Sequence, residues 1–488
     1  MVRTHFFLFL ILLLACVLRL YNFPYRYSLG VETVRDAVIG IEGARELQMP
    51  LTGSFSSLGP FTFGPLYAYQ LIIATLIFRS LYAPWIYLTL ISILYVVVIY
   101  KIGTLLEGPA LGLLVATFAA VSPAQIISAT HLTSHNVTNI FTVLAIYIFL
   151  KILKEKTSSW WNFLLGLVIG TGMNLHYQMA GLLVLPLLIF VSKPKNYVRL
   201  FACGAGVFVT FLPLLFFDLN NHWFNVRNMI YYFRFGKNMI YIPNRWLFYV
   251  RDFWPGFWAD AFGIPTILAK AIMIIFLIVT AVQVAQKKLS RPYLLLLIAL
   301  LVNFVLLRYY WGPRFYGYLN FLRPFVFLGT ASTFLFLAKN MLGRIAMFLM
   351  VVLMLYLAAP RIISELAPDG LSYDMYRQMA EVEKKLGKGR YKTFGCYHSN
   401  QARNESKSFS LAFIADLHQQ WSGPDKNIGL IANDCTDPTR LTYPPLTDGG
   451  IVDLSGASEE KLKRGGWEAI TFRGIYDANA RWWLKNDL

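Results

Sequence analysis

Charged residues are scarce in this sequence. Asp, Glu, Lys and Arg together make up 14% of its 488 residues, whereas apolar residues make up 57%. The mean hydropathy is +0.52. The core of a soluble protein of this size cannot bury so large an apolar fraction. The composition therefore excludes an ordinary soluble protein and indicates a protein that is integral to a membrane.

Cysteines and nucleotide motifs are also lacking. The four cysteines show no metal-binding spacing, and Cys16 and Cys203 lie inside apolar runs. Cys396 and Cys435 are the remaining candidates for a disulfide, which would require an oxidising compartment. The chain has no internal repeat, and no glycine-rich phosphate loop follows a strand-like run in its tail. These absences argue against a zinc module and a nucleotide-binding fold.

The formal net charge of +18 does not by itself indicate a nucleic-acid partner. A protein with many spans accumulates Lys and Arg in its cytoplasmic loops for topological reasons. We therefore expect membrane lipids as partners and no nucleic acid.

Apolar runs of spanning length predict eleven transmembrane helices. They lie at residues 4–21, 84–104, 109–127, 137–153, 160–176, 179–192, 198–217, 263–285, 291–309, 319–338 and 343–359. No small-residue cleavage site follows the first run, so we interpret it as a retained span. A twelfth run, 65–82, is rich in Tyr and contains Arg79, which is typical of a juxtamembrane helix at the interface.

Basic clusters between alternate spans predict the orientation. They are Lys151/Lys154/Lys156, Lys193/Lys195/Arg199, Lys287/Lys288/Arg291 and Lys339/Arg344. If these clusters are cytoplasmic, the N-terminus is cytoplasmic too. The loop 22–83 and the tail are then extracytoplasmic, in a plasma-membrane protein.

The composition becomes polar after Pro360, which predicts a membrane domain at 1–360 and a soluble domain at 361–488. Helix-like spacing at 374–387 and 405–421 alternates with strand-like runs at 391–398, 427–434, 449–454 and 467–477. This alternation indicates a small α/β fold.

The first external loop gathers charged residues beside the membrane. Glu32 and Asp36 are four residues apart and share one helix face, with Arg35 adjacent. One interpretation is a solvated helix face. The other is a general base, or ligands for a divalent cation (Mg, Mn or Zn) that neutralises a phosphate leaving group.

This order of features resembles the GT-C superfamily of polyprenyl-phosphate-sugar glycosyltransferases. It is most similar to the branch with protein mannosyltransferase-like and aminoarabinose-transferase-like enzymes, over residues 1–360. The first loop of that branch opens with an acid followed by Arg-Asp-Ala; here the run is GVETVRDA, residues 30–37, with Glu where Asp is common. A Tyr-rich helix then begins GPLY at 64–67.

The resemblance implies inverting transfer with Glu32 or Asp36 as the catalytic residue. We include Arg35 and Tyr67 among the substrate-binding candidates. Three arginines on the predicted outer side are candidates for binding the donor phosphate, because the arginine fork matches phosphate oxygens. They are Arg314, our first choice, with Arg323 and Arg308. The alternative is that they extend to lipid headgroups.

Other polar residues lie at predicted outer span ends. His131 and His135 are four residues apart, so both face one way and are candidate metal ligands, although a hydrogen-bonding role is the alternative. The remaining substrate-binding candidates are His176, Gln178, Asn136 and Asp218, which alternatively cap helices.

We therefore expect a membrane glycosyltransferase that moves a hexosyl or pentosyl unit from a polyprenyl-phosphate donor to a lipid, glycan or protein acceptor of the cell envelope. The alternative is a transporter or flippase of lipid-linked sugars or polysaccharide. Such a protein places ionisable residues near the middle of its spans, where this sequence nearly lacks them. A scaffold that presents the tail would leave the first-loop acids without a role.

Overall fold

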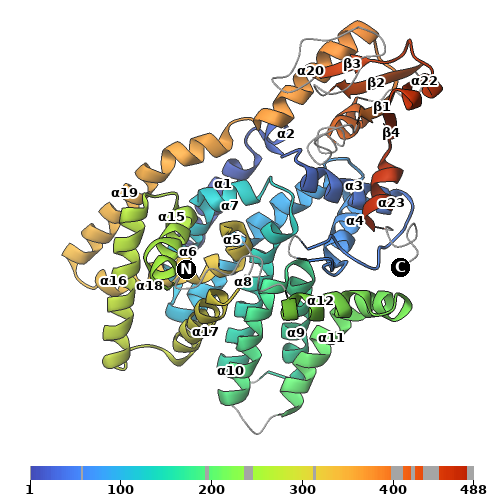
Figure 1. Cartoon of the computed structure of the whole chain (residues 1–488). Coiled ribbons are helices and arrows are strands. Elements are labelled where there is room, and N and C mark those ends of the chain that lie inside the picture. Colours follow the sequence, from blue (N-terminus) through green and yellow to red (C-terminus); the bar gives the residue numbers. More distant parts are fainter. Residues whose placement is uncertain are drawn as a thin grey trace.

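The computed structural model describes most of the chain, namely residues 2–56, 59–155, 157–192, 197–235, 246–310, 315–396, 410–418, 424–431 and 450–480. They form a helical bundle and a small α/β domain. Helices α19 (Met341–Leu366) and α20 (Gly370–Leu386) connect the two parts (Figure 1). The predicted fold class, a helical membrane protein with an α/β domain in its tail, is confirmed.

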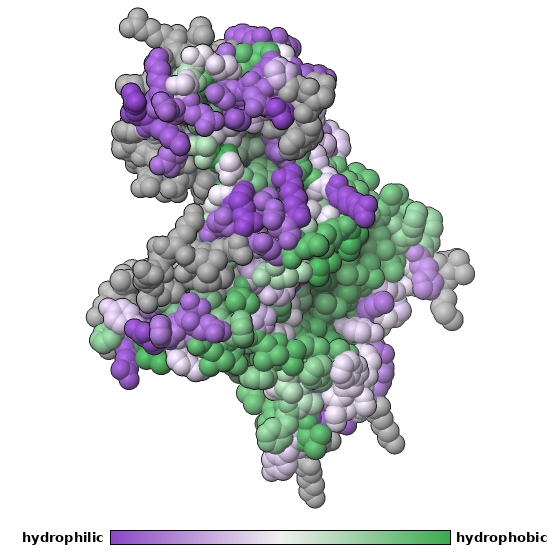
Figure 2. All heavy atoms as spheres, turned by 90° about the vertical axis from the view of Figure 1, so that its right-hand side faces the viewer, coloured by the Kyte–Doolittle hydropathy of each residue, from purple (hydrophilic) through white to green (hydrophobic). Residues whose placement is uncertain are grey.

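Among the described residues, seven helices have the length and apolar composition of membrane spans. They are α5 (Ala83–Glu107), α8 (Ser134–Lys154), α11 (Tyr197–Asn220), α16 (Thr266–Ala285), α17 (Arg291–Arg308), the continuous η3 (Tyr316–Leu322) and α18 (Arg323–Leu337), and α19. The chain is therefore an integral membrane protein. Figure 2 agrees, since hydrophilic residues gather over the α/β domain and hydrophobic residues dominate the bundle below it.

Shorter apolar helices occupy the other predicted spans. They are α1 (Val2–Leu20), α6 (Pro109–Val121) with α7 (Pro123–Ser128), α9 (Ser159–Leu175), and η1 (Tyr177–Leu183) with α10 (Val184–Ser192). All eleven predicted spans thus coincide with helical structure, and the number that cross the bilayer stays a prediction. The helices outside these spans are α2 (Phe23–Arg26), α3 (Val31–Arg45), α4 (Leu66–Phe78), α12 (Phe224–Phe235), α14 (Trp246–Phe248), η2 (Tyr249–Phe253) and α15 (Trp254–Phe262).

Helices α3 and α4 pack closely because glycines of α3 face α4. A Cβ added at Gly40 would lie 2.7 Å from Leu71 Cβ, and one at Gly43 would lie 2.7 Å from Ile72 Cδ1. A larger side chain at either position would push the helices apart. The 13 residues of α4 span about 20 Å, less than the ~30 Å hydrocarbon core. This length agrees with the juxtamembrane placement that we predict for it.

Arg19 in α1 completes the end of a neighbouring helix. Its fully buried guanidinium donates to Ala120 O (3.0 Å), Ala119 O (3.1 Å) and Ser92 Oγ (2.8 Å). Both carbonyls belong to the last turn of α6, where no intrahelical N–H is available. The positive charge also faces the negative end of the α6 dipole. Arg19 therefore joins α1, α5 and α6 at one level of the bundle.

We expect Arg19→Leu to destabilise the protein by on the order of 2 kcal/mol, because a buried carbonyl left without a donor costs about 1–3 kcal/mol. The measurement is the apparent melting temperature in detergent. Lys101→Leu, at an exposed position of α5, is the matched control. Equal melting temperatures for the two variants would contradict the role given to Arg19.

The α/β domain contains a four-stranded sheet in the order β3-β2-β1-β4. Strands β1 (Arg390–Cys396) and β2 (Asp425–Ile431) are parallel, while β3 (Gly450–Asp453) pairs antiparallel with β2 and β4 (Trp467–Ile470) pairs antiparallel with β1. Helix α20, the helical segment 410–417, α22 (Glu459–Arg464) and α23 (Phe472–Ala480) complete the domain. Cys435 and the side chain of Cys396 lie outside the described residues, so their pairing stays a prediction.

The predicted strand 467–477 is wrong in its second half, because β4 ends at Ile470 and α23 begins at Phe472. Phe472, Ile475 and Tyr476 recur at helical spacing and are all buried. The Thr471 hydroxyl accepts a hydrogen bond from the Gly474 N–H (3.0 Å) and caps the first turn. The cap and the helical spacing of the buried residues therefore favour a helix here, although the segment is rich in β-branched and aromatic residues.

The α/β domain packs on the first loop of the bundle. The Tyr27 ring contacts Trp85 in α5 (5.1 Å between centroids) and Phe413 in the domain (6.4 Å), and the Tyr27 carbonyl accepts a hydrogen bond from Ser372 Oγ (2.7 Å). Nearby, one apolar cluster joins α3, α4 and α23; its members are Ile39, Ala68, Tyr476 and Ala480. The tail therefore covers the helix that carries the candidate acids.

Candidate active site

Loops that are far apart in the sequence meet at the end of the bundle nearest the α/β domain (Figure 1). Tyr177 Oη donates to Thr62 O (2.7 Å), and the Thr62 N–H donates to Asn225 Oδ1 (2.8 Å). Asn320 Nδ2 donates to His135 O (3.3 Å). These hydrogen bonds join the first loop to η1 and α12, and they join η3 to α8.

Described members of two predicted basic clusters lie at the opposite ends of helices that lead to these loops. Arg199 donates to Thr157 O (3.2 Å) before the start of α9, and Arg291 donates to Ser192 O (3.4 Å) at the end of α10. Arg199 and Arg291 therefore lie at the ends of these helices that are far from the candidate site residues.

Asp36 and Glu32 differ in their surroundings. Asp36 is 5% exposed, and Arg35 Nε lies 2.8 Å from its Oδ1, whereas Glu32 is exposed in the first turn of α3. Burial raises the pKa of Asp36, Arg35 opposes this, and the charge of Glu32 adds to it. The interpretation of α3 as a solvated helix face is wrong for Asp36, because α4 and the α/β domain cover this helix.

Asp36 lines a small cavity of about 20 Å³. Tyr67 and Asn174 line the same cavity, and in the described part of the chain neither the Tyr67 hydroxyl nor Asn174 Oδ1 has a hydrogen-bond partner. The volume suits about one water molecule. A carboxylate, a hydroxyl and an amide oxygen that is free to accept a hydrogen bond thus share one enclosed space.

A larger cavity of about 350 Å³ adjoins this one. Phe63 lines both cavities, and its ring stacks on His176 with centroids 5.4 Å apart. The wall of the larger cavity is mainly aromatic, with a few polar groups; it includes Phe61, His176, Tyr177, Gln178, Tyr232, Asn303, Tyr310 and Tyr318. His176 and Gln178 thus line the larger cavity, Asp36 and Tyr67 line the smaller one, and Phe63 belongs to both.

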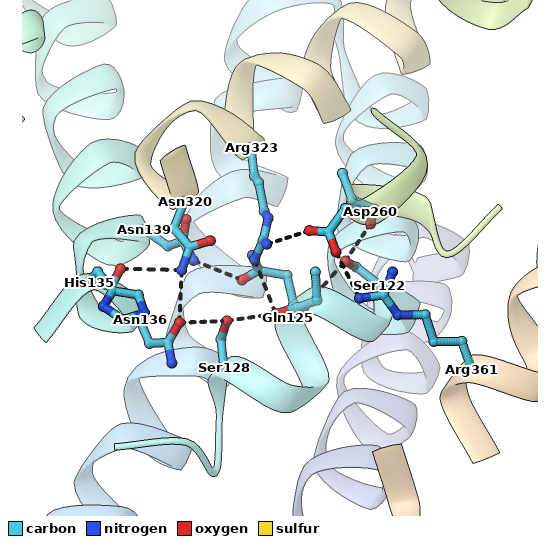
Figure 3. Close-up of polar contacts among 12 residues, drawn as sticks. Ser122, Gln125, Ser128, His135, Asn136, Asn139, Asp260, Asn320, Arg323 and Arg361 are labelled. Atoms are coloured by element: carbon cyan, nitrogen blue, oxygen red, sulfur yellow. Dashed lines mark hydrogen bonds and ion pairs between the residues drawn. The ribbon is translucent and has the colours of Figure 1, made fainter. Parts of the chain in front are cut away.

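Asn136 and His135 form part of a polar network instead (Figure 3). Asn136 Oδ1 accepts hydrogen bonds from Asn320 Nδ2 (2.8 Å) and Ser128 Oγ (3.1 Å), and its Nδ2 donates to His131 O (2.7 Å). His135 Nε2 lies 3.2 Å from the hydroxyl of Thr133. Through these contacts, Asn136 and His135 hydrogen-bond to neighbouring segments of the protein.

A metal site at these histidines would need further ligands close by. Among the residues that the structure describes, no three His, Cys, Asp or Glu side chains converge as metal ligands require. The cation site that we predict at His131 and His135 therefore has no third ligand of these types among the described residues, and it stays a prediction.

Arg323 has an anionic partner within the protein (Figure 3). Its Nη2 lies 2.7 Å from Asp260 Oδ2, and its Nη1 donates to Ala124 O (3.1 Å). Arg361 binds the other oxygen of Asp260 at 2.7 Å. The buried Arg323 therefore has a counter-charge within the protein itself.

The other predicted residues have separate surroundings. Arg308 is buried with its guanidinium 5.3 Å from the Trp246 ring centroid, and Arg314 lies outside the described residues. Asp218 accepts hydrogen bonds from the backbone N–H groups of Asn225 (2.9 Å) and Val226 (3.1 Å), so it caps α12.

Comparisons with known proteins agree with this architecture. The family model for dolichyl-phosphate-mannose-protein mannosyltransferase matches residues 62–217. The crystal structure of ArnT from Cupriavidus metallidurans bound to undecaprenyl phosphate is similar with a TM-score of 0.57 and 12% identity, over 93% of this chain and 98% of that one. The apo structure gives a TM-score of 0.54 and 11% identity, over 88% and 92%.

The chain has the GT-C fold. The predicted resemblance to this superfamily is thereby confirmed. No curated protein sequence matches the chain.

Two residues near Asp36 and Arg323 were missed by the sequence analysis. Asn174 lies two positions before His176, and that proximity was the available signal. Asp260 was visible as an acid in the Trp-rich segment, but nothing in the local sequence indicates that it meets Arg323, 63 positions later.

Proposed function

We propose that this protein is a membrane glycosyltransferase that moves a sugar from a polyprenyl-phosphate donor to an envelope acceptor on the extracytoplasmic face. The observation that carries the proposal is the pair of adjoining cavities with Phe63 between them. One is large and aromatic, as a lipid-linked sugar requires, and the other contains a buried carboxylate. The GT-C fold supports the same reaction class.

Asp36 is the proposed general base. It takes the proton of the acceptor hydroxyl as that oxygen attacks the anomeric carbon of the donor, and the lipid phosphate leaves from the opposite face. Arg35 holds the Asp36 carboxylate in place. The Tyr67 hydroxyl and Asn174 Oδ1, both without partners in the described structure, are available to bind sugar hydroxyls.

The donor is placed in the larger cavity. Aromatic rings there offer apolar faces to the prenyl chain and the sugar, and His176 and Gln178 offer polar atoms. Arg308 at the end of α17 and Arg314 are the proposed phosphate-binding residues. Arg323 is a weaker candidate, because its charge is already balanced by Asp260. No step is assigned to a metal, because the described residues offer no group of three His, Cys, Asp or Glu ligands.

We infer the orientation of the protein in the membrane from the basic ends of its helices. If the basic ends of the helices face the cytoplasm, both cavities and the α/β domain are extracytoplasmic. A polyprenyl-phosphate donor then presents its phosphate at the membrane surface beside the aromatic cavity.

The decisive experiment measures covalent sugar transfer in membranes from a radiolabelled panel of polyprenyl-phosphate hexoses and pentoses. We expect one donor to give a new glycosidic product in membranes that contain the protein and none in membranes that lack it. A parallel sample with chelator tests metal dependence. Movement of an intact lipid-linked sugar across the membrane without a new glycosidic bond would replace this proposal with a transporter.

The pH profile provides a second test of the base. Asp36 must be ionised to act as a base, so kcat/KM should fall as the pH is lowered through its raised pKa. This fall is the acid limb of the pH profile. Glu32→Gln removes a negative charge that favours protonation, so the limb should move to lower pH. Arg35→Gln removes the opposing positive charge, so the limb should move to higher pH. The measurement is kcat/KM against pH, and a limb that neither variant moves would exclude Asp36 as the titrating base.

A further inference from the structure

A separate cavity lies where the α/β domain meets α3. It measures about 390 Å³, within the range of about 300–1,000 Å³ that small-molecule sites occupy. Among the described residues, Arg45 contributes to it from α3, and the rest of its wall comes from the tail, including Lys392, Asp416, Glu459, Ala469 and Phe472. We propose that this cavity binds a neutral saccharide unit. If the proposed function holds, that unit belongs to the acceptor.

The charges of the cavity wall indicate a neutral ligand. Arg45 Nη2 lies 3.1 Å from Asp416 Oδ2, and Lys392 Nζ lies 3.4 Å from Glu459 Oε1, so each cation of the wall has an anion beside it. An anionic ligand would have to compete with these carboxylates. Sugar hydroxyls both donate and accept hydrogen bonds, and they match a wall that offers carboxylate acceptors next to cationic donors.

The floor of the cavity is apolar and aromatic. Tyr391, Phe394 and Phe472 line it and are largely buried, and the Arg45 guanidinium lies over the Phe472 ring, 5.1 Å from its centroid. Aromatic surface with a few fixed polar groups is typical of small-molecule sites. The C–H face of a sugar ring fits such a floor, while its hydroxyls reach the charged rim.

Two helices connect this cavity to Asp36. On α3, Arg45 follows Asp36 by nine residues, or about 13 Å along the helix. On α23, Phe472 lines the saccharide cavity, whereas Asn479 and Ala480 at its other end line the Asp36 cavity. A glycan held by one sugar unit in the tail therefore has the base within reach of another unit.

A blocking variant tests the proposal. Ala469 and Glu468 are adjacent exposed residues of β4 and point to opposite faces of the sheet, but only Ala469 lines the cavity. Ala469→Trp should fill the cavity, and Glu468→Trp is the matched control. Glu459→Gln, which removes a charged acceptor at the rim, serves as a second variant if the tryptophan perturbs folding.

The readout is saturation-transfer NMR on the full chain in nanodiscs, with maltose, mannobiose and cellobiose as neutral probes and glucose 1-phosphate as the anionic comparison. We expect a signal from at least one disaccharide with wild type and Glu468→Trp, and a loss of at least fivefold with Ala469→Trp and with Glu459→Gln. A signal from glucose 1-phosphate alone, from none of the probes, or from a disaccharide equally in all variants overturns the proposal.

This binding measurement is independent of catalysis. Asp36→Asn should bind the disaccharide as wild type does, although it should lose transfer. Disaccharide binding by wild type without any sugar transfer by wild type would sink the glycosyltransferase proposal and leave the saccharide site standing. In the transfer assay, Ala469→Trp should raise the KM for a glycan acceptor about tenfold and leave the donor KM unchanged. Transfer with an unchanged acceptor KM would remove the site and leave the enzyme.

Discussion

Asp36→Asn is expected to lower sugar transfer by about 10²–10⁴-fold, the usual contribution of a positioned general base. The amide has nearly the shape of the carboxylate but cannot take the acceptor proton. Because Asp36 lies in the small cavity and not in the larger one, donor binding should be preserved. The measurement compares kcat and donor KM for purified wild type and variant.

Glu32→Gln is the matched control, since it changes the same chemical group one helical turn earlier at an exposed position. It should retain activity within about tenfold at neutral pH. If Glu32→Gln abolishes transfer and Asp36→Asn does not, the catalytic carboxylate is the exposed one, and the buried cavity loses its assigned role.

Asp260→Asn is expected to cost about 3–5 kcal/mol of stability, because it leaves the buried Arg323 without its counter-charge. The Arg323 side chain is 5% exposed, and its Nη2 lies 2.7 Å from the carboxylate. Arg361 contributes less, since its side chain is 41% exposed and is screened by solvent. The apparent melting temperature in detergent should fall accordingly.

The matched control is Asp252→Asn in η2, whose pair with Arg251 is largely exposed and should contribute at most about 1 kcal/mol. A double variant, Asp260→Leu with Arg323→Met, should regain much of the lost stability, because removing both charges leaves none buried without a partner. Melting of Asp260→Asn at the temperature of Asp252→Asn would show that the pair is not structural.

Sequence patterns located the elements well and the partners poorly. Apolar runs placed every predicted span on a helix, and the shift to polar composition after Pro360 placed the α/β domain in the tail. Within 467–477, however, the apolar run has the length of a strand, whereas Thr471 caps a helix that begins at Phe472. Burial of α23 against α3 and α4 adds to this local cap, and no local pattern contains that burial.

In the candidate site, too, the sequence identified residues but not the residues that they contact. The charged run of the first loop identified Asp36 and Glu32 as equals, and the structure separates them by burial. Arg323 was identified as needing an anionic partner, and the partner is Asp260 from a distant helix. Asn174 and the wall that α23 adds to the Asp36 cavity depend on chain segments that are hundreds of residues apart.

The sequence alone determined that this chain lies in a membrane, which of its loops are basic, and which short segments concentrate charged and polar residues. These properties follow from composition and period, which act over a few residues at a time. The tertiary structure alone decided which carboxylate is buried, which arginine is neutralised and which cavities adjoin. Those outcomes depend on desolvation and on contacts between segments distant in the chain, and both exist only once the helices have packed.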